Sequence, residues 1–334
     1  MNRARLRMAG AWGLGLLLIL LLFILGDASQ LVSLPEIHWG ALVLLFVSNA
    51  GFTIAHNFRW KGIVENLSPS RPIGFFTLYR FLIDSYAIGK VIPMDVSLLG
   101  VRSYYLSRLE GSSVSIAVFS VLLDRFLDVI IFLSMALPSF LLITRTTDAI
   151  SSFLILALLL VGQGVVLSWK KGESFRFLFS SYRFILARWG SKIPFLRNRM
   201  KGGIDVTGGP GQFTFRSVIK IMTWNYIKYI FLSLRFFLTG QALGISFPII
   251  QSFFFLPFVQ LSGLINVTPG GIGVVEAVTY GALLLMGLPT SQILIFIVGQ
   301  RVLLTAMFVS LFVLNRLFYF VYSKWRREES LSWR

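Results

Sequence analysis

The chain has 334 residues, of which 56% are hydrophobic and only 13% are charged, with a mean hydropathy of +0.78. This composition excludes a soluble globular protein, because most of the length must face lipid or other apolar helices. A formal charge of +17 favours cytoplasmic loops facing anionic lipid, and we expect no nucleic-acid partner. The absence of cysteine excludes disulfides and thiolate sites, and only His38 and His56 remain as imidazoles, so we expect no metal and no cofactor.

The first half of the sequence contains four apolar runs that can cross a membrane as helices. About 20 mostly apolar residues are needed, because an α-helix rises roughly 1.5 Å per residue and the hydrocarbon core is roughly 30 Å thick. The first run follows three arginines as in a signal peptide, but no convincing cleavage site follows, so we expect a retained helix. The second run leads into Arg59, Trp60 and Lys61, which predicts an anchor at the cytoplasmic interface. The four runs cover residues 9–25, 39–56, 113–143 and 150–169.

A fifth apolar run, at residues 73–92, is interrupted by charged residues and does not look like a membrane-spanning helix. Arg80, Asp84 and Lys90 break its apolar character, and Pro93 follows directly. Because Arg80 and Asp84 lie four residues apart, they can pair on one helical face, which favours burial in protein or a re-entrant hairpin. We expect a re-entrant segment here.

The central stretch of residues 170–201 carries nine Lys or Arg residues against one acid, Glu173. This asymmetry predicts a cytoplasmic loop. Aromatic residues interleave with the charges, as in a helix lying on an anionic membrane surface, and a basic solvated linker fits the composition equally well.

The second half predicts further spans at residues 217–243, 247–265, 270–286 and 291–322, followed by a basic tail. With both termini cytoplasmic, the number of full spans is even, so we expect eight spans plus the re-entrant segment. The expected fold is an all-α polytopic integral membrane protein of the cytoplasmic membrane, with two pseudo-symmetric halves as an option. Its single transmembrane domain (1–334) comprises a half-bundle (1–169), a basic cytoplasmic loop (170–215), a second half-bundle (216–322) and a cytoplasmic tail (323–334).

Residues 266–289, NVTPGGIGVVEAVTYGALLLMGLP, place a polar break directly before an apolar helix. Thr268 is the expected N-cap and Pro269 the first helical residue, so unpaired N–H groups of the first turn point into the break. Such groups bind anions, and the phosphate of a lipid headgroup is the expected guest. For the small residues of this helix, close helix packing without a ligand is the favoured interpretation. Three glycines of the break leave room for a headgroup, namely Gly270, Gly271 and Gly273.

Glu276 follows the break inside the apolar helix, where a charge costs about 3 kcal/mol unless it is paired or hydrated. Lys228 and Arg235 lie seven residues apart on one helical face, so both charges can project into one cavity. For each basic residue the alternative is snorkelling to an interface. The basic residues able to pair with Glu276 are Arg80, Arg102, Lys228, Arg235 and Arg301, and with Asp84 they complete our predicted headgroup-binding set.

Asp124, Arg125 and Asp128 lie within the apolar run of residues 113–143, near its expected inner boundary. We interpret them as a structural ion network rather than as ligands for a substrate. No paired catalytic carboxylates, metal cluster or nucleophile with a base is visible elsewhere in the sequence, so we do not expect an enzyme.

The two halves also share a faint internal repeat. Pro93 followed by Arg102 in the first half resembles Pro269 followed by Glu276 in the second, with 176 residues between the prolines. Interrupted hydrophobic segments in matching positions of two halves are typical of transporter binding sites.

Three sequence segments resemble the lysylphosphatidylglycerol synthase/flippase transmembrane family. PGGIGVVE at residues 269–276, followed by GLP at 287–289, is similar to the proline-glycine-glycine and glutamate signature of that family. VRSYYLSR at 101–108 and LDRFLD at 123–128 are similar to two further family segments, in family order. The family's first break usually carries a Gly-rich Pro segment with a Glu before the arginine, whereas Pro93 here precedes Asp95. Whether Asp95 substitutes for that Glu or the half-site differs stays open.

The resemblance implies a membrane module that moves or presents a polar lipid. No soluble aminoacyl-transferase domain follows Tyr322 in this sequence, so we do not expect the synthase activity of the fused family members. The leading hypothesis is a flippase for an anionic or glycosylated membrane lipid, and the alternative is a membrane-embedded transferase, or its accessory subunit, acting on a lipid headgroup. A homo-oligomer and a partner lipid-modifying enzyme both stay open.

Overall fold

The computed structural model describes residues 37–68, 73–90, 92, 94–108, 112–144, 146–168, 213–264 and 273–332, with side chains left out at 95, 164, 166–168, 264 and 321–332. Within this part of the chain there are nine α-helices and no strand, which confirms an all-α polytopic membrane protein. Three of these helices are long and apolar enough to cross a membrane, namely α2 (Trp39–Leu67), α5 (Val114–Ile143) and the Thr290–Phe320 part of α12 (Thr290–Ser332). The run at residues 9–25 and the loop at 170–201 lie outside the described residues.

The two halves repeat one order of helix lengths, long, short, short, long. In the first half α2 has 29 residues, α3 (Phe75–Ile88) 14, α4 (Met94–Arg108) 15 and α5 30. In the second half α9 (Phe215–Ala242) has 28 residues, α10 (Ile249–Leu264) 16, α11 (Val274–Leu285) 12 and α12 43. The helix α6 (Ala149–Ser168) follows the first set.

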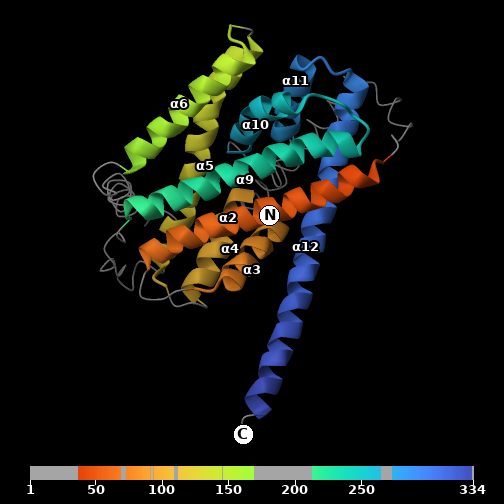
Figure 1. The fold of residues 1–334 in the computed structure, drawn as a ribbon. Coiled ribbons are helices and arrows are strands. Elements are labelled where there is room, and N and C mark those ends of the chain that lie inside the picture. The colour runs from red at the N-terminus through yellow and green to blue at the C-terminus, as the bar shows by residue number, and fades with distance from the viewer. Residues whose placement is uncertain are drawn as a thin grey trace, which may run out of the picture.

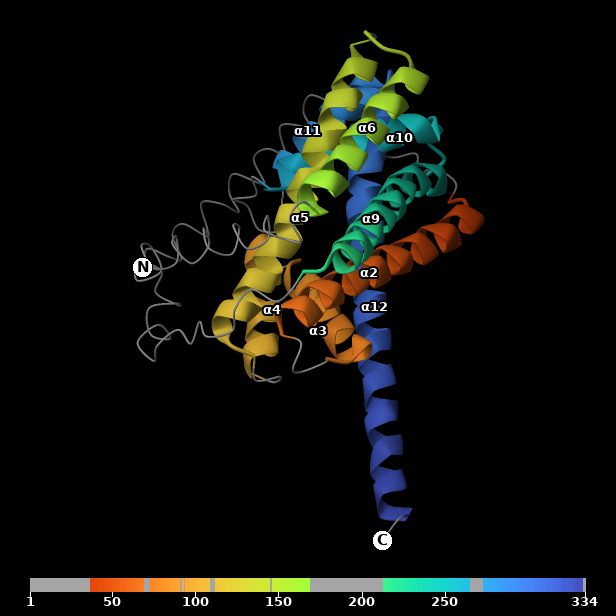
Figure 2. The same cartoon turned by 60° about the vertical axis from the view of Figure 1, so that its left-hand side comes forward.

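The neighbours of each helix also repeat between the two halves, as the helix lengths do. The long helices α2 and α9 lie side by side, with α3 and α4 at one end of the molecule and α10 and α11 at the other (Figures 1 and 2). The helix α3 packs against α12 of the other half, and α10 packs against α5. This exchange of neighbours supports the two-fold plan.

The short helices are too short to cross a bilayer alone. At about 1.5 Å per residue, the 14 residues of α3 cover about 21 Å, less than the roughly 30 Å of the hydrocarbon core. Each short pair is joined at a break, between α3 and α4 and between α10 and α11. The length of α3 fits a re-entrant segment, which remains a proposal.

Local sequence explains where several helices begin and why α2 and α9 meet closely. The side chain of Ser113 accepts a hydrogen bond from the Ile116 N–H at the start of α5, as expected of an N-cap serine. Across the α2–α9 contact, a Cβ added at Gly51 would lie 2.5 Å from the ring of Phe231, so only glycine permits this approach. Aromatic and aliphatic residues from both halves then form one core.

The helix α2 corrects one expectation. The predicted span ended at residue 56 with an interfacial anchor at Arg59 and Trp60, but the helix continues to Leu67, and both side chains are fully buried. The anchor interpretation is wrong because Arg59 has buried carboxylate partners, which hold its charge inside the protein.

Candidate functional site

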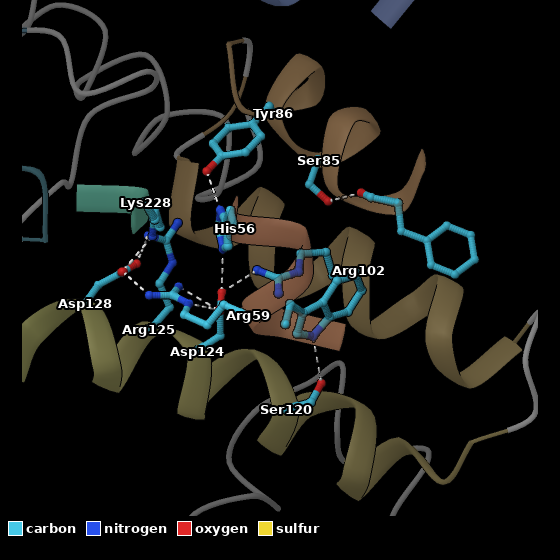
Figure 3. Close-up of polar contacts among 12 residues, drawn as sticks. His56, Arg59, Ser85, Tyr86, Arg102, Ser120, Asp124, Arg125, Asp128 and Lys228 are labelled. Carbon is cyan, nitrogen blue, oxygen red and sulfur yellow. Dashed lines mark hydrogen bonds and ion pairs between the residues drawn. The ribbon is translucent and has the colours of Figure 1, made fainter. Parts of the chain in front are cut away.

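A group of charged side chains, which we call the buried ion cluster, lies where α2, α4, α5 and α9 meet (Figure 3). Asp124 on α5 accepts hydrogen bonds from Arg59 Nε at 2.8 Å and Arg102 Nη1 at 2.8 Å, and its Oδ2 lies 2.7 Å from His56 Nε2. Asp128, one turn later, accepts from Arg59 Nη1 at 2.5 Å and Lys228 Nζ at 2.6 Å. The cluster consists of His56, Arg59, Arg102, Asp124, Asp128 and Lys228.

The helical spacing of the two aspartates explains the cluster. Asp124 and Asp128 are four residues apart on α5, so both carboxylates face the same neighbours. Both are almost completely buried, and such charges are tolerated inside a protein only when paired and hydrogen-bonded. Because Arg59 bonds to both carboxylates, the cluster ties α2 to α5 and resembles the predicted structural network. Arg125, the third predicted member, lies 3.5 Å from Asp128.

A cavity of about 220 Å³ adjoins the buried ion cluster. Lys90 and Met94 line it from the two sides of the first break, while Gly263 and Val275 line it near the second. Described residues beside both breaks therefore border the same space. The charged lining residues are five cations and one acid, namely Lys90, Arg125, Lys228, Arg235, Arg301 and Asp128.

Glu276 lies beside this cavity in the first turn of α11. Its Oε2 accepts a hydrogen bond of 2.7 Å from the Gly273 N–H, and its Oε1 accepts from Arg301 Nε. Arg301 is thus its partner among the five candidates. A carboxylate here satisfies a free N–H group and interacts favourably with the helix dipole. The carboxylate of Glu276 thereby occupies one of the N–H groups that we predicted to bind an anion at the start of this helix.

The start of α11 also differs from the prediction. The expected N-cap Thr268 and first residue Pro269, with Gly270 and Gly271, lie outside the described residues. The described helix begins at Val274, after Gly273 with a φ of +97°, a left-handed conformation that glycine adopts without strain. Glu276 is therefore in the first turn rather than deep in the helix.

Three predicted headgroup ligands lie away from the cavity lining. Arg102 is fully buried, bonded to Asp124 and 3.9 Å from the ring centroid of Trp60. Arg80 and Asp84 share a face of α3 and interact at longer range, but the close ion pair of Asp84 is with Arg316 of α12 at 2.9 Å. The guanidinium of Arg80 lies over the ring of Tyr319 instead, 4.3 Å from its centroid. Both differences follow from the packing of α12 against α3.

Sequence reasoning missed His56 and Arg59, although a signal was present. Asn49, Thr53, His56 and Arg59 recur at spacings of four, three and three residues, which places them on one face of α2. All four are fully buried. A polar stripe along an otherwise apolar span faces protein rather than lipid, so this pattern predicts an interior site.

Comparison with known proteins gives one family. The family described as the lysylphosphatidylglycerol synthase TM region matches residues 10–312. Comparisons with curated proteins and with solved structures found no match. The family match confirms the resemblance that the sequence motifs indicated.

Proposed function

Because the chain belongs to the lysylphosphatidylglycerol synthase TM region family, we propose that it is a lipid transporter that moves a polar lipid across the membrane. The family match supports a lipid-related membrane role, and the transport step is our proposal. The headgroup occupies the cavity between the two breaks while the acyl chains remain in lipid.

The observation that carries this proposal is the charge of the cavity. Five cations and one acid line about 220 Å³ in the interior of an apolar helix bundle. Charges at such depth are costly, and they occur in membrane proteins mainly along substrate and ion pathways. An anionic headgroup supplies the missing negative charge, and lysine and arginine bind phosphate through charge-assisted hydrogen bonds.

The arrangement of the helices supports alternating access. In transporters built from repeats, substrate binds near interrupted helices at the repeat interface, and one half moves against the other. Here the α3–α4 and α10–α11 pairs both border the cavity through Lys90 and Val275. In our proposal Lys228, Arg235 and Arg301 hold the headgroup, and small movements of the short helices expose it to one side or the other.

We further propose that the protein lies in the cytoplasmic membrane with both termini inside. The basic loop at residues 170–201 and the basic ends of the sequence support this orientation. The cysteine-free sequence permits a direct test with single cysteines at Ser29, Thr146 and Ser191. The first two should react with an impermeant thiol reagent in intact cells, and reaction of the third would contradict the orientation.

Transport is tested in vesicles containing the purified protein and labelled phosphatidylglycerol, with accessibility of the label to an external quencher as the readout. We expect protein-dependent movement, reduced about tenfold by Arg235→Gln, a change that corresponds to about 1.4 kcal/mol. The matched control is Lys220→Gln, because Lys220 is an exposed cation of the same helix α9 outside the cavity.

The same vesicles distinguish a transporter from an enzyme. Lipid extracted after the assay should have an unchanged mass, because transport breaks no bond. A protein-dependent change of headgroup mass would favour the membrane-embedded transferase. A folded protein that leaves phosphatidylglycerol in its original leaflet, or an Arg235→Gln variant that moves it normally, would contradict the proposed role of the cavity.

A further inference from the structure

The cations of the cavity differ in whether an acidic side chain pairs with them. Asp128 pairs with Lys228 and, at longer range, with Arg125, and it also binds Arg59 of the buried ion cluster. Glu276 pairs with Arg301. Three of the five cations therefore have an acid partner, and the remaining two are Lys90 and Arg235.

Lys90 and Arg235 have only neutral partners among the described residues. Arg235 Nη1 donates a hydrogen bond of 3.1 Å to Asn49 Oδ1, and its guanidinium lies 4.6 Å from the ring centroid of Phe52. The ammonium of Lys90 lies 5.1 Å from the ring centroid of Phe308. Aromatic rings attract cations but leave their charge in place.

These two cations also act on each other. The ammonium of Lys90 is repelled by the charges of both Arg235 and Arg301. They come from different parts of the sequence, the first break and the middle of α9, and both side chains reach the same cavity. Two cations without an acid partner among the described residues face one cavity and attract a guest that brings two negative charges, since opposite charges attract more strongly at low dielectric.

We propose that the cavity selects the phosphomonoester end of a lipid. A phosphomonoester carries about 1.5 to 2 negative charges near pH 7 and offers three acceptor oxygens. A phosphodiester headgroup with neutral substituents carries a single charge and neutralises only one of the two cations. This inference rests on the proposed function and narrows its substrate to one headgroup class.

The same charges exclude a lysylated headgroup. The lysyl ester of phosphatidylglycerol adds ammonium charge to a diester phosphate, and that charge would enter a space lined by five cations. Juxtaposed like charges suppress the wrong partner. The lipid in the family's description is therefore a poor guest for the cavity of this chain.

The test measures binding to the purified full-length protein in detergent. The lipid probes are phosphatidic acid, phosphatidylglycerol and lysylphosphatidylglycerol with matched acyl chains, and inorganic phosphate and pyrophosphate serve as soluble probes. We expect phosphatidic acid to bind about tenfold more tightly than phosphatidylglycerol, which in turn binds more tightly than the lysylated lipid. Inorganic phosphate should bind far more weakly than phosphatidic acid, because the acyl chains contribute.

The double variant Lys90→Gln with Arg235→Gln should lose the preference for phosphatidic acid, while Lys220→Gln should retain it. Thermal melting of each variant shows whether the fold survives, and either single variant serves if the double variant does not fold. Equal affinity for the two anionic lipids would overturn the inference, as would an unchanged preference in the variants. Equally tight binding of inorganic phosphate would assign the cavity to free phosphate instead.

This experiment separates the substrate class from the transport step, because binding in detergent requires no movement of lipid. If the protein moves phosphatidylglycerol in vesicles but shows no preference for phosphatidic acid, the transporter proposal stands and the substrate class is wrong. If it binds phosphatidic acid selectively but moves no lipid, the substrate class stands and the transporter proposal is wrong.

Discussion

Two ion pairs occupy matching places in the repeated helix order but have different surroundings. Arg102 on α4 pairs with Asp124 on α5, and Glu276 on α11 pairs with Arg301 on α12. Both partners of the first pair are fully buried, and Asp124 also binds His56 and Arg59. In the second pair the side chain of Arg301 is 34% exposed and lines the cavity.

The difference teaches that the same place in the helix order can hold a closed ion pair in one half and an accessible one in the other. A buried carboxylate with several partners cannot release one without leaving an unpaired charge, which is strongly unfavourable. Arg301, by contrast, faces a space that an anion can enter, so a headgroup can compete with Glu276 for the guanidinium. The second pair is therefore the one that binding can rearrange.

The largest effect is expected at the centre of the buried ion cluster. Asp124→Asn removes the charge that compensates Arg59 and Arg102, and unpairing a buried ion costs about 3–5 kcal/mol. Denaturant unfolding of the detergent-solubilised protein measures this loss. The matched control is Asp148→Asn, because Asp148 is exposed and accepts a hydrogen bond from the Ser151 N–H, a role that asparagine can take over. Similar stability of both variants would show that the cluster does not hold the bundle together.

A smaller loss of stability is expected at the edge of the cluster. Asp128→Asn weakens charged hydrogen bonds to Arg59 and Lys228, and such bonds contribute about 1.5–3 kcal/mol. Because the change leaves more positive charge beside the cavity, anion binding should persist, so stability should fall more than lipid movement. Melting and vesicle transport are measured on the same preparation. A stable variant that moves no lipid would instead make Asp128 part of the transport site.

For the pair of Glu276 with Arg301 we expect the reverse of the Asp128 result, namely a larger loss of transport than of stability. Glu276→Gln keeps the shape but removes the negative charge beside Arg301, so phosphatidic acid should bind more tightly while lipid movement falls about tenfold, the effect of about 1.4 kcal/mol of lost coupling. The melting temperature should change little, because Arg301 remains partly hydrated. Glu276→Asp, which keeps the charge, is the control. Normal transport by Glu276→Gln, or loss of transport only through unfolding, would remove Glu276 from the mechanism.

The smallest effect is expected at the pair of Lys61 with Glu65, which lie one turn apart on α2. Both side chains are partly exposed, by 25% and 33%, and ion pairs at the surface contribute about 0–1 kcal/mol. Lys61→Gln should therefore lower stability by less than about 1 kcal/mol in denaturant unfolding and leave transport unchanged, since neither residue lines the cavity. A large loss of transport would place this pair in the transport cycle and extend the comparison to a third ion pair.

The sequence predicted the helices of the described part to within a few residues at most ends. The run at 113–143 became α5 (Val114–Ile143) and the run at 150–169 became α6 (Ala149–Ser168). The main exceptions were α4, which was not predicted as a helix, the C-terminal ends of α2 at Leu67 and α12 at Ser332, which lie well beyond the predicted ends, and the start of α11 at Val274. Apolar periodicity, capping residues and breaks are local properties of the chain, so they can be read without its neighbours.

The sequence by itself determined that the protein is a helical membrane protein of this family, with interrupted helices and charges inside apolar runs. Only the tertiary structure decided which charges meet. It joined Arg59 to Asp124, 65 residues later, and Asp84 to Arg316, 232 residues later, and within the described part of the chain it gave Lys90 and Arg235 no acid partner. Ion pairing depends on which helices pack together, because Coulomb attraction acts over distances in space and is independent of separation along the chain.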